Sequence, residues 1–358
     1  MSKKKKSALR EKPGVSDAGI SNKSSIERIK TKRKTTINTD DLISGIRNKD
    51  ITALSRAITL IESKNPKHLI KANSVIKRCL PHANKSVRIG ITGVPGVGKS
   101  TFIEVFGKYL TAQGKRLAVL AIDPSSTITK GSILGDKTRM QDLVKDSSAY
   151  IRPSASGESL GGVARKTRES IILCEAAGFD VIIIETVGVG QSETTVHSMV
   201  DFFLLLKLAG AGDELQGIKR GIIELADAIV INKADSDNFK RAKLAQLEFH
   251  RALHLYPKKT SGWQPQVSIC SAIENKGIEP IWELIMEYIK LTSENNFFDS
   301  KRIDQNKNWL IQCIEGQLKT NFFNKPEIKK EFENQLHLIE TNKTSPFAAA
   351  DYLLSLEF

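Results

Sequence analysis

The stretch Val87–Thr101, VRIGITGVPGVGKST, is an apolar run that leads into glycines, a lysine and a serine at the spacing G-x-x-x-x-G-K-[ST]. The apolar run predicts a buried strand, and the residues after Ser100 predict a helix. Glycines carry no side chain, so the loop can turn its backbone N–H groups inward around a polyphosphate. The residues expected to bind the nucleotide phosphates are Gly93, Gly96, Val97, Gly98, Lys99, Ser100 and Thr101.

Two side chains of this loop carry specific chemistry. Lys99 is expected to reach the β- and γ-phosphates, and the Ser100 hydroxyl is placed to ligate Mg²⁺. The helix that follows offers the positive end of its dipole to the same phosphates. The stretch therefore predicts a nucleoside triphosphate site at the end of a strand.

The chain has 358 residues, of which 40% are hydrophobic, enough for a substantial core in one large or two modest domains. No apolar run approaches the length of a membrane-spanning helix, so we expect no membrane span. Lys3–Lys6 are followed by polar residues, which argues against a secretory signal.

The formal net charge of +14 is concentrated at the N-terminus, because residues 1–39 alone carry a net charge of +9. Residues 1–38 are expected to form a disordered basic tail. An organelle transit peptide or a contact with an anionic surface are the alternatives for this tail. The rest of the chain lacks the basic and aromatic interleaving of single-strand binding, so no nucleic acid is expected as a partner.

Cysteine and histidine spacing gives no clear metal site. The four cysteines are scattered and form no C-x-x-C pair, which argues against zinc and favours a reducing compartment. His250 and His254 have a spacing that can ligate a metal on a helix, but no acidic or cysteine partner is near in sequence. We therefore interpret the histidine pair as packing.

The pattern divides the chain into four parts. After the tail, residues 39–84 predict three short helices that begin at Thr39–Asp41, Asp50 and Asn65-Pro66. Residues 85–292 alternate strands with helices, which predicts an α/β domain with a mainly parallel sheet covered by helices on both faces. The expected strands are Val87–Thr92, Arg116–Ile122, Ala149–Arg152, Val181–Glu185, Phe202–Leu206, Ala228–Asn232 and Gln266–Cys270. Residues 293–358 predict a helical extension that packs on its own core or serves as a dimerisation arm, with helices at Asn308–Lys319, Glu327–Leu338 and Phe347–Phe358.

Two acidic residues follow the expected strand Arg116–Ile122. Asp123 comes directly after Arg116–Ile122, and Asp136 lies in the Gly/Ser-rich segment beyond it. Either carboxylate is a candidate ligand of phosphate-bound Mg²⁺ or of its water shell, and either could instead serve only a turn or a cap. The segment around them has the composition of a loop that a γ-phosphate orders.

The strand Val181–Glu185 ends in Glu185 and is followed by Gly188, where most GTPases carry Asp-x-x-Gly. One added methylene moves the carboxylate of Glu185 roughly 1.5 Å outward, toward the metal's water shell or the attacking water. Val189 stands where small signalling GTPases carry a water-orienting glutamine, and Gln191 comes two residues later. Gln191 could orient the water only if the loop rearranges, so we expect slow intrinsic hydrolysis that depends on a partner. Gln191 and Glu193 could instead simply cap the next helix.

The strand Ala228–Asn232 is followed by the base-reading pattern Asn232-Lys233-x-Asp235. The Asp235 carboxylate can accept both the ring N–H and the exocyclic amine of guanine, which adenine cannot offer together. Lys233 can lay its methylenes over the base, and Asn232 can tie this loop to the phosphate loop. Ser271-Ala272, after the last strand, fits a further guanine-contacting loop.

The chain contains, in this order, the segments GVPGVGKST, AIDPSS, GSILGDKTRM, ETVGVGQSE, AGAGDELQGIKRG and NKAD. From about residue 40 to 290 it resembles the GTPase chaperones of adenosylcobalamin-dependent methylmalonyl-CoA mutase, the MeaB or ArgK family. This resemblance implies N-terminal helices, a central P-loop GTPase domain and a C-terminal dimerisation extension that forms a homodimer. It also implies a GTPase that binds GTP or GDP with Mg²⁺, gates cobalamin loading of the mutase and protects it.

Carried onto this sequence, the resemblance makes Lys99 and Ser100 the ligands of phosphate and Mg²⁺. Asp123, Asp136 and Glu185 become acidic Mg²⁺ or catalytic positions, and 209–221 matches an extra switch that contacts the mutase. Similar proteins have also been described as kinases of an arginine/ornithine transport system, which is the alternative function. Relatives work in bacterial cytoplasm and in mitochondria, so we expect the cytoplasm and leave the mitochondrial matrix open.

Overall fold

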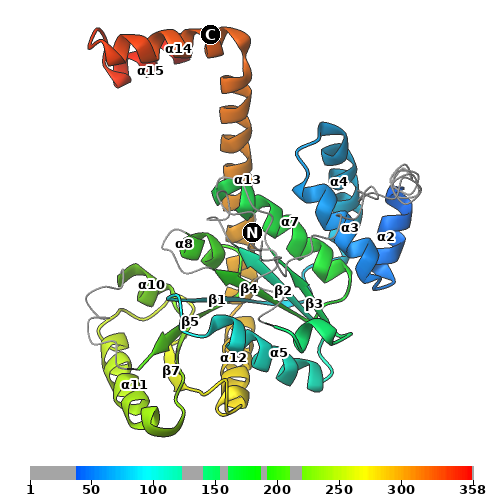
Figure 1. Ribbon diagram of the computed structural model, residues 1–358, viewed down its shortest axis with the longest axis vertical. Coiled ribbons are helices and arrows are strands. Elements are labelled where there is room, and N and C mark those ends of the chain that lie inside the picture. The colour runs from blue at the N-terminus through cyan, green and yellow to red at the C-terminus, as the bar shows by residue number, and fades with distance from the viewer. Residues whose placement is uncertain (1–37, 123–139, 154–159, 187–191, 210–219, 357–358) are drawn as a thin grey trace, which may run out of the picture.

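A seven-stranded parallel sheet forms the centre of the protein in the computed structural model (Figure 1). The structure describes residues 38–122, 140–153, 160–186, 192–209 and 220–356. The strand order is β3-β2-β4-β1-β5-β6-β7, and every neighbouring pair is parallel. The strands are β1 (Val87–Gly93), β2 (Leu117–Ile122), β3 (Ala149–Arg152), β4 (Val181–Thr186), β5 (Phe202–Leu208), β6 (Ala228–Asn232) and β7 (Gln266–Ile269). All seven expected strands are confirmed, with ends that shift by one or two residues.

Helices cover both faces of this sheet. One face packs against α5 (Lys99–Ala112) and α12 (Ile278–Glu294), whose apolar residues meet the side chains of Ile89, Ile91 and Ile183. The other face packs against α7 (Leu160–Ala176), α8 (Ser192–His197), α10 (Arg220–Leu225) and α11 (Phe239–Leu253). Because β1 and β4 lie inside the sheet and are buried on both faces, they read as continuous apolar runs.

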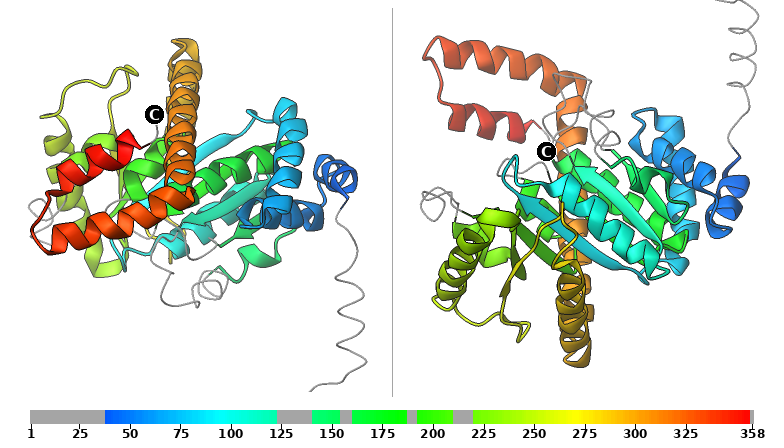
Figure 2. Two further views of the ribbon diagram at one scale, coloured as in Figure 1. Left: turned by 90° about the horizontal axis from the view of Figure 1, so that it is seen from above. Right: turned by 60° about the horizontal axis from the view of Figure 1, so that its bottom comes forward.

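The three N-terminal helices lie beside α7, on the side of the sheet nearest β3 (Figures 1 and 2). They are α2 (Thr39–Arg47), α3 (Ile51–Glu62) and α4 (Pro66–Cys79). Asp50 and Asn65 cap α3 and α4 with side-chain oxygens, as the sequence predicts, and Asn38 caps α2. Pro81 lies in a 3₁₀ turn, Leu80–His82, directly after α4.

The C-terminal extension differs from the sequence expectation. The pattern at Asn308–Lys319 belongs to one 28-residue helix, α13 (Phe297–Asn324), which begins eleven residues earlier. It is followed by α14 (Pro326–Glu340) and α15 (Pro346–Ser355). The second half of α13 leaves the body of the protein, and α14 and α15 lie side by side at its far end (Figure 1). No helix of the described part of the chain is both long and apolar enough to span a membrane.

Buried ion pairs attach the first turns of α13 to the amino ends of the strands. Arg302 donates to both carboxylate oxygens of Asp201, at 2.8 and 2.7 Å, and to the carbonyl oxygens of Asn84 and Ser86. Gln305 Nε2 donates to the Val200 carbonyl at 2.8 Å. These bonds satisfy a guanidinium that is only 7% exposed, so α13 is fixed where the extension begins.

His197, at the end of α8, lies close to this attachment. Burial lowers the pKa of His197 to about 4, and the nearby Lys301 and Lys259 add to the effect against the attraction of Asp227. The imidazole is therefore neutral in the folded protein at pH 5, whereas an unfolded histidine is mostly protonated there. The unfolded state binds the extra proton, so His197 lowers stability as the pH falls from about 6.5 toward 4.

We expect a His197→Gln variant to lose less stability than the wild type between pH 7 and pH 5, by about 2 kcal/mol. The measurement is the free energy of urea-induced unfolding at both pH values. His254→Gln, at an exposed histidine, is the matched control. Equal losses in wild type and His197→Gln would contradict a buried neutral imidazole.

Candidate functional site

The loop after β1 is held in a shape that requires glycine. Gly96 and Gly98 have φ angles of +81° and +91°, in the left-handed region that side chains disfavour. A Cβ on Gly93 would lie 2.6 Å from the Leu206 carbonyl oxygen, and one on Gly98 would lie 2.9 Å from Asn232 Nδ2. Residues of β5 and β6 therefore leave no room for a side chain at Gly93 or Gly98, which explains why the motif has glycine at both positions.

Lys99 and Ser100 begin α5 directly after this loop. Lys99 Nζ donates to the Gly93 carbonyl oxygen at 2.7 Å, so the ammonium folds back over the loop. The Ser100 hydroxyl lies 3.4 Å from Glu185 Oε1, at the end of β4. Thr186 donates to Thr92 at 2.8 Å, which fixes the ends of β4 and β1 relative to each other. Lys99, Ser100 and Glu185 therefore meet at the carboxyl edge of the sheet, where ligands of such folds bind.

The oxygens of Ser100 and Glu185 are hard donors of the kind that Mg²⁺ prefers. Glu185 is only 7% exposed, so its charge is held beside the loop instead of in bulk water. Asp123, Asp136, Gly188, Val189 and Gln191 lie outside the described residues. Within the described ranges no three His, Cys, Asp or Glu side chains form a metal-binding group, and the rings of His250 and His254 pack 4.7 Å apart.

Asn232 joins the phosphate loop to the two base-reading loops. Its Nδ2 donates to the Val97 carbonyl oxygen at 2.9 Å, and its Oδ1 accepts from the Ala272 backbone N–H at 3.3 Å. The thiol of Cys270 also donates to Oδ1, at 3.4 Å. Burial raises the pKa of Cys270 to about 12, so the thiol stays protonated and keeps this bond. The tie to the phosphate loop was expected from the sequence, whereas nothing in the sequence indicated the Cys270 contact.

The backbone around Asp235 is held by contacts on both sides. Lys233 has a φ of +59°, and Asn238 Nδ2 donates to its carbonyl oxygen at 2.7 Å. The Ala234 N–H donates to the Cys270 carbonyl at 3.0 Å, which joins this loop to Ser271-Ala272. Asp235 itself is half-buried. Sequence reasoning missed Asn238, although asparagine three residues after an aspartate is a common turn signal.

A cavity of about 570 Å³ lies between these two loops. It is lined by residues that include Ala234, Ser236, Cys270 and Ser271. The cavity and the phosphate loop lie at the same edge of the sheet, because β1, β6 and β7 are all parallel. The arrangement holds a phosphate cradle, a hydroxyl–carboxylate pair and a base-reading loop in one site.

The family profile described as "Methylmalonyl Co-A mutase-associated GTPase MeaB" matches residues 54–327. The chain belongs to the MeaB family. The matched range contains the glycine-rich loop after β1, Glu185 and the loops after β6 and β7. The chain is therefore a P-loop GTPase, a hydrolase that binds guanine nucleotides.

Individual proteins agree with this MeaB assignment. The chain is 43% identical over 304 residues to "GTPase ArgK" of Escherichia coli, which covers 85% of this chain and 92% of that protein. It is 43% identical over 325 residues to "Methylmalonic aciduria type A homolog, mitochondrial" of Mus musculus, covering 88% of this chain and 78% of that protein. A solved structure of a protein named "LAO/AO transport system kinase" has a TM-score of 0.73 and 35% identity, and covers 90% of this chain and 99% of that one.

We expect Asn232→Ala to weaken GDP and GTP binding at least tenfold, since it leaves the Val97 carbonyl and the Ala272 N–H without their buried partner. Titration with a fluorescent GDP analogue measures the affinity. Asn334→Ala is the matched control, because its amide bonds only to Glu331 on the exposed surface of α14. An Asn232→Ala affinity within twofold of wild type would show that the loops do not need this tie.

Proposed function

We propose that this MeaB-family GTPase uses its nucleotide cycle to assist adenosylcobalamin loading of methylmalonyl-CoA mutase, or of a close acyl-CoA mutase, and to protect that enzyme. The observation that carries the proposal is the family match over 54–327, whose description names the mutase. The name of the similar mouse protein, which refers to methylmalonic aciduria, supports the same link.

In this proposal the phosphates of GTP lie in the loop Gly93–Gly98, where Lys99 leaves the Gly93 carbonyl to contact the β- and γ-phosphates. Ser100 and Glu185 are the described residues that would hold Mg²⁺, and the chemistry of this pair fits that ion. Bound Mg²⁺ neutralises charge on the phosphates. Asp123, Asp136 and Gln191 are further proposed contributors, on the sequence pattern alone.

The base is read by Asp235, with Lys233 over its face and Ser271-Ala272 on the opposite loop. Asn232 positions these groups against the phosphate loop, as its bonds to Val97 and Ala272 indicate. Glu185, one methylene longer than aspartate, and Val189, which cannot orient water, support slow intrinsic hydrolysis that a partner accelerates.

The C-terminal helices are proposed to pair two copies of the chain. A groove of about 800 Å³ lies between α13, α14 and α15, and its lining is mainly apolar, with Phe323, Leu336 and Leu354 partly exposed. Apolar surface of this extent favours association.

A reducing compartment, the cytoplasm or the mitochondrial matrix, is proposed because Cys79, Cys174 and Cys270 are buried free thiols.

We expect Asp235→Asn to lose GTP affinity about 100-fold and to gain affinity for xanthosine triphosphate. Xanthine has a carbonyl where guanine has the exocyclic amine, and an asparagine amide can donate to that carbonyl. Competition against a fluorescent nucleotide measures both affinities, and Asp304→Asn on the exposed surface of α13 is the control. Retained GTP affinity, or ATP hydrolysis by the wild type, would overturn the assignment of guanine to Asp235.

The proposed partner is tested by co-purification with candidate acyl-CoA mutases, followed by single-turnover measurement of phosphate release. We expect a complex, faster GTP hydrolysis within it, and neither nucleotide binding nor stimulation for Lys99→Ala. Light scattering of the GTPase alone is expected to give the mass of two chains.

The name of one similar protein of solved structure, a transport system kinase, favours a different function. In that alternative this chain would be a kinase associated with an arginine/ornithine transport system. Transfer of labelled γ-phosphate to a protein side chain would support that function. Absence of any mutase complex together with such transfer would replace the chaperone proposal.

A further inference from the structure

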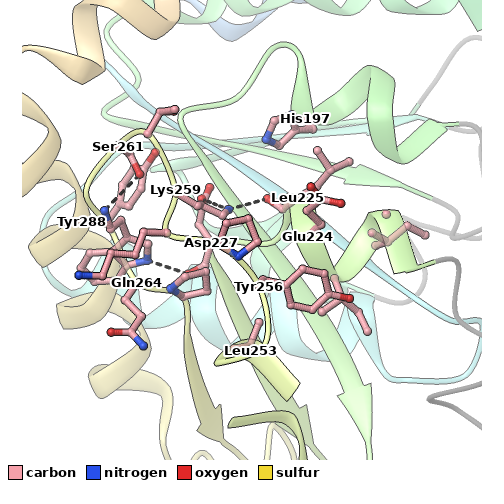
Figure 3. A pocket seen from close by; sticks show the side chains of 18 of the residues that line it. His197, Glu224, Leu225, Asp227, Leu253, Tyr256, Lys259, Ser261, Gln264 and Tyr288 are labelled. Atoms are coloured by element: carbon pink, nitrogen blue, oxygen red, sulfur yellow. Dashed lines mark hydrogen bonds and ion pairs between the residues drawn. The ribbon is translucent and has the colours of Figure 1, made fainter. Parts of the chain in front are cut away.

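A further cavity, of about 860 Å³, lies at the opposite edge of the sheet from the glycine-rich loop after β1. Figure 3 shows this cavity from close by. Asp227 lies directly before β6 and Trp263 shortly before β7, so the cavity is at the amino ends of these strands. Other walls come from α8, α10, the loop after α11, and the α12–α13 junction. The volume falls in the range of cavities that bind small organic molecules.

At the floor of this cavity, the ammonium groups of Lys259 and Lys301 lie near the same carboxylate, that of Asp227. Lys259 Nζ donates to Asp227 Oδ1 at 2.7 Å and to the carbonyl oxygens of Leu225 and Ala226, so its three N–H groups are used (Figure 3). Asp227 Oδ2 accepts the Phe203 N–H at 2.9 Å. Lys301 Nζ lies 4.0 Å from Asp227 Oδ2 and donates to the Asp201 carbonyl oxygen at 2.6 Å.

This floor carries one net positive charge, because Lys259 and Lys301 share the carboxylate of Asp227 while Asp201 pairs with Arg302. The Lys301 side chain is only 14% exposed, so that charge is largely withdrawn from water. Its one short hydrogen bond leaves donor capacity on the ammonium, and Lys301 lines the cavity. A buried cation of this kind is stabilised by an anion.

Two further polar groups line the same space. The Tyr288 hydroxyl and the His197 imidazole form no hydrogen bond to any described residue, although both side chains are largely buried. Each can therefore donate to a ligand, since His197 stays neutral and keeps one ring N–H. Lys301, Tyr288 and His197 come from α13, α12 and α8, so three elements contribute polar side chains to the lining of the cavity.

The rest of the lining mixes apolar and polar side chains. Its apolar part includes Ile222, Leu253, Tyr256 and Trp263, which favour a ligand with a hydrophobic body. The charged lining residues, Lys258, Lys259 and Lys301 against Glu224 and Asp227, sum to +1. This net charge suits a ligand with one negative charge better than a polyphosphate.

We propose that this cavity is a binding site for an organic monoanion with an aromatic or branched apolar body. Its single carboxylate or sulfonate group lies against Lys301 and Tyr288, and its body packs on Trp263 and Leu253. The site is separate from the nucleotide site and does not rest on the mutase role.

The test compares two fluorescent probes with the same apolar body in the full-length protein. 8-Anilinonaphthalene-1-sulfonate carries one sulfonate, and N-phenyl-1-naphthylamine carries none. We expect Lys301→Met to weaken binding of the sulfonate about tenfold or more, which is the loss of one charged hydrogen bond, and to change binding of the neutral probe less than twofold.

Two further variants locate the probe and guard against misfolding. Gly221→Phe is expected to weaken both probes, because Gly221 lines the cavity and a Cβ added there meets no described atom within 4 Å, while the ionic floor stays intact. Lys319→Met makes the same chemical change beside the C-terminal groove and is expected to leave both affinities unchanged. Absence of sulfonate binding to the wild type overturns the proposal. So does equal binding to wild type and Lys301→Met, or a loss confined to Lys319→Met.

Discussion

The amide of Asn232 is the contact that joins three loops at the carboxyl edge of the sheet. One side chain at the end of β6 bonds to Val97 in the phosphate loop and to Ala272 in the last loop, so three loops share one buried hub. Each loop follows a different parallel strand, and strands fix only where a loop starts. The bonds of Asn232 fix the course of the loops beyond the ends of the strands. Because Asn232 is only 1% exposed, water cannot easily replace its bonds, and a lost bond leaves a buried polar group unsatisfied.

The sheet and the phosphate loop could be predicted because local patterns determine them. Apolar runs such as Val181–Ile184 are typical of strands buried on both faces, and the caps Asp50 and Asn65 each act within three residues. The bond between Asn232 and Val97 was predictable only because the loop motif and the base motif occur in a known order. Cys270 supports the same site through a contact that nothing local to it indicates, whereas the bond of Asn238 to the Lys233 carbonyl spans only five residues.

The parts that could not be predicted depend on contacts between distant residues. The first helix of the C-terminal extension was expected at Asn308–Lys319, whereas α13 begins at Phe297. The structure shows that Lys301 and Arg302 both donate hydrogen bonds to Asp201, which directly precedes β5 and lies about one hundred residues earlier in the chain. The cavity around Lys301 and Tyr288 was missed for the same reason, because its floor and walls come from five separate segments.

The attachment of α13 has a mechanical consequence. Its first turns are clamped at Arg302 and Gln305, whereas about fifteen residues beyond Trp309 extend from the body as a rod of about 22 Å. A tilt of about 10° at the clamp displaces the far end of that rod by about 4 Å. Gln305 is bonded to Val200, three residues after α8, so the rod turns a small shift near the sheet into a large movement at α14 and α15.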